Sequence, residues 1–163
     1  MVRAVLGFFG GYAVVVVIVM AGFLLLPTAI GVDRVLKPGS YETSTTWHLV
    51  ATGIGIVGSV AGGAACALIA RPRSRAPLVL AGVMLVLGLV TAFMQPEGLE
   101  GEAAVRPADE PPAQSIMSAR KTPEPPIIRY SNPFVGALGV LAGSLLVPGR
   151  RRRQVDEGAS AAE

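Results

Sequence analysis

Apolar, uncharged residues fill four long stretches of this chain, and polar connections separate them. The stretches are Val5–Ile30, Leu49–Ala70, Leu78–Met94 and Phe134–Val147. A helix of about 20 apolar residues, rising about 1.5 Å per residue, crosses a hydrocarbon layer of about 30 Å. Backbone groups inside lipid must bond to one another, so each stretch is expected to be helical. The pattern therefore predicts an all-α integral membrane protein with four transmembrane helices.

These stretches divide the chain into four parts. The parts are residues 1–94, with helices at about 5–26, 49–70 and 78–94; residues 95–132; residues 133–148; and residues 149–163. The second part is rich in proline and poor in large apolar residues, which predicts a disordered extracytoplasmic loop. The last part is a basic, polar tail that we expect in the cytoplasm.

The fourth helix is expected to be short. Asn132 would be its N-cap, and Pro133 would be its first helical residue. Because residues 133–147 would extend only about 22 Å, a re-entrant segment is the alternative to a full span.

The first stretch could also be read as a signal peptide. A signal peptide has an apolar region of about 7–15 residues, and this stretch is far longer. We therefore expect an uncleaved transmembrane helix at the start of the chain.

Arginines gather at alternate ends of the predicted helices. They are Arg3, then Arg71, Arg73 and Arg75, then Arg150, Arg151, Arg152 and Arg153. Basic residues concentrate in cytoplasmic connections, so both termini are predicted in the cytoplasm. Arginine outnumbers lysine 12 to 2 in a chain rich in Ala, Gly and Val, which favours a GC-rich bacterium and hence its inner membrane. The two arginine clusters are predicted to fix topology and to contact anionic lipid headgroups.

Small residues crowd the second stretch at a spacing typical of close helix packing. They are Gly55, Gly58, Ser59, Gly62 and Gly63, and the pair Gly139 and Gly143 repeats the spacing in the fourth stretch. Such residues let helix backbones approach closely in lipid. We expect them to pack helices within one chain, and oligomerisation is the alternative. The Ser44-Thr45-Thr46 cluster before this stretch offers N-cap hydroxyl groups.

The remaining chemistry of the chain is sparse. The net charge is +3, but the basic residues lie at helix ends rather than on one face, which argues against a nucleic-acid partner. Cys66 and His48 are the single residues of their types, so neither a disulfide nor a histidine pair can form within one chain. The four stretches contain no ionisable side chain of the kind that marks transporters and membrane enzymes. We therefore predict no catalytic, cofactor-binding or metal-binding residue.

These observations predict a non-enzymatic structural or accessory membrane protein. It would act through helix packing and its extracytoplasmic loop, with membrane lipids, other subunits or a second copy as partners. The alternative is an oligomeric channel or transporter subunit, with Gly58, Gly62, Gly139 and Gly143 at close interfaces. Its polar lining would be Thr52, Ser59, Thr91 and Ser144.

Overall fold

The computed structural model describes residues 2–70, 74–94, 105–107, 110–119, 122 and 124–147. Its helices are α1 (Val2–Ile30), α2 (Val32–Val35), α3 (Thr45–Ile69), α4 (Ala76–Phe93), α5 (Pro112–Ala119) and α6 (Pro126–Leu145). Extended pairing within these ranges is limited to two isolated bridges, Leu36 with Thr43 and Ser40 with Val105. The predicted all-α class is confirmed.

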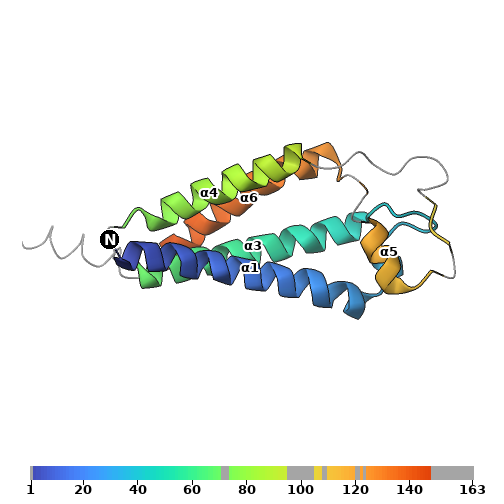
Figure 1. Ribbon diagram of the computed structural model, residues 1–163, viewed down its shortest axis with the longest axis horizontal. Helices are drawn as coiled ribbons and strands as arrows, with labels where there is room; N and C mark the ends of the chain where they lie inside the picture. Colours follow the sequence, from blue (N-terminus) through green and yellow to red (C-terminus); the bar gives the residue numbers. More distant parts are fainter. Residues whose placement is uncertain are drawn as a thin grey trace, which may run out of the picture.

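The four long helices form a bundle in which each one runs antiparallel to the long helix before it in the sequence (Figure 1). Helix α3 packs against both α1 and α6, α6 packs against α4, and α4 also contacts α1. The beginnings of α1 and α4 lie at one end of the bundle, together with the ends of α3 and α6. We call this the N-terminal end, and the opposite end, where α2 and α5 lie, the cap end.

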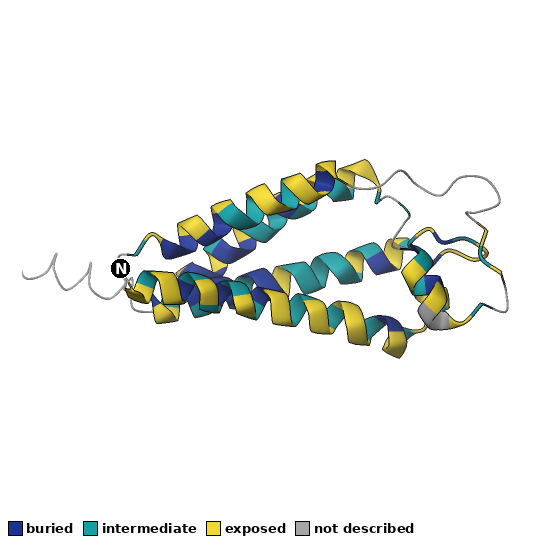
Figure 2. Ribbon diagram, viewed as in Figure 1, coloured by how far each residue is buried: buried dark blue, intermediate teal, exposed yellow. Residues whose placement is uncertain are grey.

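Within the part of the chain that the structure describes, three helices are long and apolar enough to cross a membrane, namely α1, α3 and α4. Many of their large apolar side chains are exposed, including Val17, Leu24 and Val86, and exposed residues recur along each of these helices (Figure 2). A water-soluble bundle would cover such a surface, whereas lipid accommodates it. The chain is therefore a membrane protein, as the apolar pattern predicts.

Helix α6 begins earlier than the sequence predicts. It starts at Pro126, so the expected N-cap Asn132 and first residue Pro133 both lie inside the helix, and the expected start at residue 133 is wrong. Pro125 and Pro126 set this start, because proline fits the first helical turn, where its missing N–H is not needed. Pro133 removes one helical hydrogen bond but is buried against α4, where it lies next to Gly88. The 20 residues of α6 extend about 30 Å.

The segment 95–132, expected to be disordered, contains helix α5 and the start of α6. Within α5, Ser115 and Ala119 are buried, and the helix contacts α2. The prediction of disorder is therefore corrected for residues 112–119 and 126–132. Contacts with the first connection stabilise α5, and composition alone does not reveal such contacts.

The first connection, residues 31–44, is compact. Gly39 has a φ of +66°, which the predicted Pro38-Gly39 turn requires. Within the Ser44-Thr45-Thr46 cluster that was predicted to offer N-cap hydroxyl groups, Ser44 is the N-cap of α3: its hydroxyl oxygen accepts a hydrogen bond from the Trp47 N–H at 3.1 Å. The same hydroxyl donates to the Arg34 carbonyl at 2.5 Å, so the start of α3 is tied to α2.

Two groups of buried apolar residues lie at the two ends of the bundle. The four-helix core, at the N-terminal end, contains Cys66, Ala70, Ala76, Leu80, Ala81 and Val140. The cap core, at the other end, contains Val35, Leu36, Tyr41, Trp47 and Ala119. Helix α1 packs the partly buried Ala4, Phe8 and Tyr12 against the first core, so all four long helices meet there, whereas neither α4 nor α6 contributes to the second. The α4–α6 pair therefore diverges from α1 and α3 toward the cap end (Figure 1).

Candidate functional site

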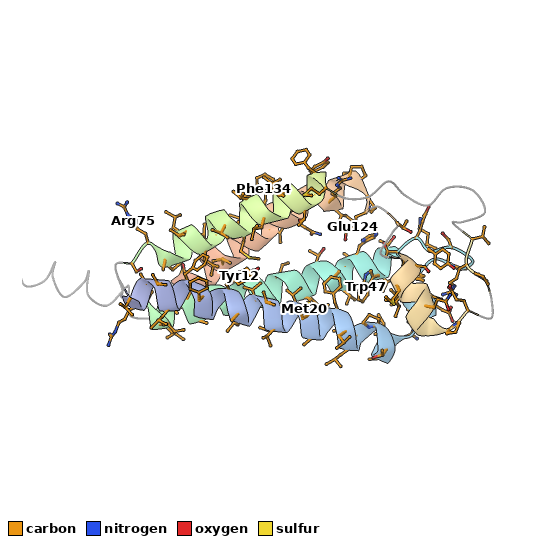
Figure 3. All side chains as sticks on the ribbon, in the orientation of Figure 1. Tyr12, Met20, Trp47, Arg75, Glu124 and Phe134 are labelled. Carbon is orange, nitrogen blue, oxygen red and sulfur yellow. The ribbon has the colours of Figure 1, made fainter. Side chains whose placement is uncertain are left out.

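Hydrogen bonds and ion pairs between side chains gather at the cap end of the bundle. Residues 32–44, 105–107 and 110–119 form a small folded unit there, which we call the cap (Figure 1). Trp47 and Glu124 mark the same end in Figure 3, whereas Arg75 marks the opposite end. The cap joins the first connection of the chain to the proline-rich segment that follows α4.

The Glu110 carboxylate holds the two segments of the cap together. The Tyr41 hydroxyl donates a hydrogen bond to Glu110 Oε1 at 3.0 Å, and the Ser115 hydroxyl donates to Oε2 at 2.8 Å. Ser115 is only 1 % exposed, and Tyr41 is also buried. Hydrogen bonds to a charged acceptor are the stronger kind, and breaking one would leave a buried hydroxyl unpaired. This carboxylate therefore connects segments that lie 69 residues apart in the sequence.

A second set of contacts fastens the same two segments. Arg106 Nη2 lies 2.6 Å from Asp33 Oδ1, and the Arg106 N–H donates to the Gly39 carbonyl at 3.1 Å. The Arg106 side chain is 14 % exposed and the Asp33 side chain 90 %. Because one partner is in solvent, the ion pair contributes at most about 1 kcal/mol. Its main effect is to position residues 105–107 along the first connection, beside the bridge from Ser40 to Val105.

The cap rests on the ends of α1 and α3 through the cap core. Trp47 is buried, and its ring meets the Phe23 ring edge to face, with centroids 5.5 Å apart and planes at 88°. Such aromatic pairs contribute about 0.5–1.5 kcal/mol beyond the area they bury. Ala119 of α5 completes this core, so the cap is packed onto the bundle as well as hydrogen-bonded within itself.

The cap should loosen at alkaline pH because of Tyr41. Burial raises the pKa of Tyr41 above its ordinary value of 10.0, and the hydrogen bond to the Glu110 carboxylate raises it further. The neutral phenol is thus favoured in the folded cap, and its stabilising effect is full below pH 10 and lost as the pH rises through the raised pKa. We expect the emission of Trp47, the only tryptophan, to shift to the red above about pH 10.

In the variant Tyr41→Phe, this alkaline shift should disappear or move to higher pH, because the titrating group is gone. Tyr12→Phe, a change at the opposite end of the bundle, is the matched control and should behave like the wild type. The same alkaline midpoint in Tyr41→Phe and the wild type would show that Tyr41 does not control the cap.

The predicted packing residues of α3 lie on two adjacent faces that meet different helices. Toward α1, a methyl group added at Gly62 would lie 2.7 Å from the Gly11 carbonyl oxygen, and one at Gly58 would lie 3.2 Å from Val19. Toward α6, a methyl group at Gly63 would overlap the Val140 carbonyl oxygen. Both contacts are within one chain.

The predicted small residues of α6 meet the second of these faces. A methyl group at Gly139 would overlap the Ser59 hydroxyl, and one at Gly143 would overlap the Val60 carbonyl oxygen. Gly55 is the exception among the predicted residues, because a methyl group there would meet nothing within 4 Å. The structure therefore brings six of the seven residues to helix contacts and leaves Gly55 beside open space.

Of the seven arginines predicted to fix topology or contact lipid, only Arg75 lies within the described residues. It is exposed, immediately precedes α4, and lies at the N-terminal end of the bundle (Figure 3). Arg71, Arg73 and Arg150 to Arg153 lie outside the residues that the structure describes.

The hydroxyl groups of the bundle bond mainly to their own helices. Ser59 donates to the Ile56 carbonyl at 3.0 Å, Thr91 to the Gly88 carbonyl at 2.9 Å, and Ser144 to the Leu141 carbonyl at 2.7 Å. Thr52 differs, because its hydroxyl lies 3.5 Å from Asn132 Oδ1 on α6. Among the described side chains, no three His, Cys, Asp or Glu residues come close enough together to hold a metal ion.

Sequence reasoning missed Arg129, which lies in the first turn of α6. The expected start of this helix at residue 133 placed Arg129 in a loop, and so the fourth helix was expected to contain no ionisable residue. The Pro125-Pro126 pair, followed by Ile127 and Ile128, is the signal that could have located the helix start. The Tyr41, Glu110 and Ser115 cluster carries no comparable signal, because the fold alone brings these residues together.

No protein-family model matches this chain, and neither a curated protein nor a solved structure is significantly similar to it. The candidate function therefore depends on the geometry of the bundle and the cap.

Proposed function

We propose that this protein is a non-enzymatic, four-span scaffold of a bacterial inner membrane, which presents its cap to a partner protein outside the cytoplasm. One observation carries the proposal: two segments distant in sequence fold into one cap. Hydrogen bonds to the Glu110 carboxylate and a small core around Trp47 hold it together. An ordered polar surface on a membrane bundle is suited to binding another protein, because little ordering entropy is lost on association.

The geometry of α6 supports a fourth span. Its length of about 30 Å equals the thickness of a hydrocarbon layer, and it runs antiparallel to α4 and parallel to α3. Its polar residues Arg129 and Asn132 lie near the cap end, where the helix would meet the membrane surface. The exposed Arg3 and Arg75 lie at the opposite end, which favours that end as the cytoplasmic one.

The internal use of the small residues favours a scaffold over an oligomeric channel. Gly62, Gly63 and Gly143 make their close contacts within one chain, so they are not free to pack against a second copy. Three of the four hydroxyl groups considered as a channel lining already donate to carbonyl groups of their own helix. These contacts satisfy the hydroxyl groups without a shared polar path.

One labelling experiment tests both the orientation and the binding role. Cys66 is first replaced by serine, and a single cysteine is then introduced at the exposed Gln114 of the cap. A membrane-impermeant maleimide that carries a photoreactive group is added to intact cells with a permeable outer membrane. We expect labelling of the Gln114→Cys variant and, after irradiation, a discrete adduct with one other protein.

Arg75→Cys, an exposed position at the opposite end, is the matched control and should be labelled only after the membrane is opened. Labelling of Gln114→Cys only in opened membranes would refute the orientation. Efficient labelling without any protein adduct would instead refute the binding role of the cap and leave the topology intact.

A further inference from the structure

The Arg129 guanidinium is held in a fixed position at the cap end of the α4–α6 pair. Its Nε–H donates to the Ala92 carbonyl oxygen, in the last turn of α4. Its Cζ atom lies 5.5 Å from the centroid of the Tyr130 ring, and that ring lies 5.5 Å from the Phe93 ring. A cation over an aromatic ring, beside a second ring, is an arrangement typical of a membrane surface.

Arg129 heads a polar-to-apolar gradient along one face of α6. Arg129, Asn132 and Gly136 are spaced by three and four residues, which places them on the same helix face. Asn132 contacts Thr52 of α3, whereas the Arg129 guanidinium lies against Ala92 of α4, so this face of α6 lies between α3 and α4. From the membrane surface inward, the charge of Arg129 is thus followed by the Asn132 amide beside the Thr52 hydroxyl group, and then by Gly136.

Among the described residues, open space lies beside Gly55 of α3 and Gly136 of α6, below this polar contact. A methyl group added at Gly55 of α3 or at Gly136 of α6 would meet no atom within 4 Å. One turn further, Ser59 and Gly139 close the interface again. The Thr52–Asn132 contact and the Ser59–Gly139 contact are seven residues apart on each helix, about 10 Å along the axis. Both glycines are half-buried, and close packing is the rule in protein interiors, so the open space beside them has room for an occupant.

We infer that this site binds one anionic phospholipid. Its phosphate pairs with the Arg129 guanidinium, its ester oxygens lie near Asn132 and Thr52, and an acyl chain fills the interval beside Gly55 and Gly136. An arginine presents several N–H donors to a phosphate, and lipid is the apolar material available at this depth. The inference uses the proposed membrane placement of α6, but it does not depend on the binding role of the cap.

Native mass spectrometry of the full chain in mild detergent tests the inference. The starting variant carries glutamine at Arg150 to Arg153, so that the basic tail does not contribute lipid binding. We expect this variant to hold one molecule of dioleoylphosphatidylglycerol more tightly than dioleoylphosphatidylcholine. Adding Arg129→Gln should weaken the phosphatidylglycerol complex by about fivefold, the effect of one basic group near a lipid surface. Adding Gly136→Leu, which fills the interval and keeps Arg129, should weaken the binding of both lipids.

Two matched controls separate this site from general effects of charge and volume. Arg3→Gln removes an exposed arginine at the opposite end, outside the two arginine clusters, and Gly82→Leu adds volume at an exposed position on α4. Both should leave lipid binding unchanged. Equal effects of Arg129→Gln and Arg3→Gln, or of Gly136→Leu and Gly82→Leu, would overturn the inference. So would displacement of the lipid by glycerol phosphate at equal concentration, since the acyl chain would then play no part.

Discussion

Gly63→Ala should destabilise the bundle more than any other single methyl addition on α3. The new methyl group would overlap the Val140 carbonyl oxygen, which belongs to the backbone of α6 and cannot rotate away. The two helices would have to separate, and such overpacking costs about 1–3 kcal/mol. Lower thermal stability of the purified protein in detergent is the expected result. Gly143→Ala should act similarly, because its methyl group would overlap the Val60 carbonyl oxygen.

Gly55→Ala is the matched control on the same helix. Its methyl group would meet no atom within 4 Å, and alanine is the better helix former by about 1 kcal/mol. This variant should therefore be as stable as the wild type or more stable. If both variants lower the melting temperature equally, the close approach of α3 and α6 cannot be what makes Gly63 important.

Trp47→Ala should release the cap from the bundle. Trp47 is 7 % exposed and is the largest side chain of the cap core, where it packs against Phe23. Removing a buried tryptophan costs about 3–5 kcal/mol, because a cavity remains where the ring was. The loss of stability should be mainly local to the cap, since α4 and α6 contribute nothing to this core. Hydrogen exchange should therefore become faster at the backbone of α5 while the four-helix core stays protected.

Leu49→Ala provides the comparison for this second result. Leu49 lies two residues further along α3 and is 72 % exposed, so its truncation leaves no cavity. Exchange in α5 should then match the wild type. Faster exchange of α5 in both variants would indicate that the cap depends on the helix itself rather than on the buried ring.

Local patterns in the sequence were sufficient to predict much of the bundle. The long apolar stretches predict α1, α3 and α4, because a helix that satisfies its own backbone is the stable form of such a segment in lipid. Ser44 was predictable as an N-cap because a hydroxyl before a helical stretch serves the first free N–H groups directly. Both features depend on residues within a few positions of one another.

Glycine spacing predicted that small residues would pack helices but not which helix each would meet. A spacing of three to four residues defines a stripe on one helix, whereas the partner is set by how the other helices approach. Gly62 and Gly63 are neighbours in the sequence, yet one meets α1 and the other meets α6. Gly55 shares the stripe and meets neither, because α6 diverges from α3 toward the cap end.

Only the tertiary structure decided the cap, the start of α6 and the position of Arg129. Composition predicts that a proline-rich segment lacks enough apolar surface to fold by itself. In the folded chain, Ala119 packs with Tyr41 and Trp47, and Glu110 accepts hydrogen bonds from both Ser115 and Tyr41, so the first connection supplies the surface that the segment lacks. The Arg129 side chain is likewise positioned by its hydrogen bond to the Ala92 carbonyl of another helix. The sequence by itself determined the membrane-spanning helices, because their hydrogen bonds are local, and the tertiary structure decided the candidate sites, because their partners lie far apart along the chain.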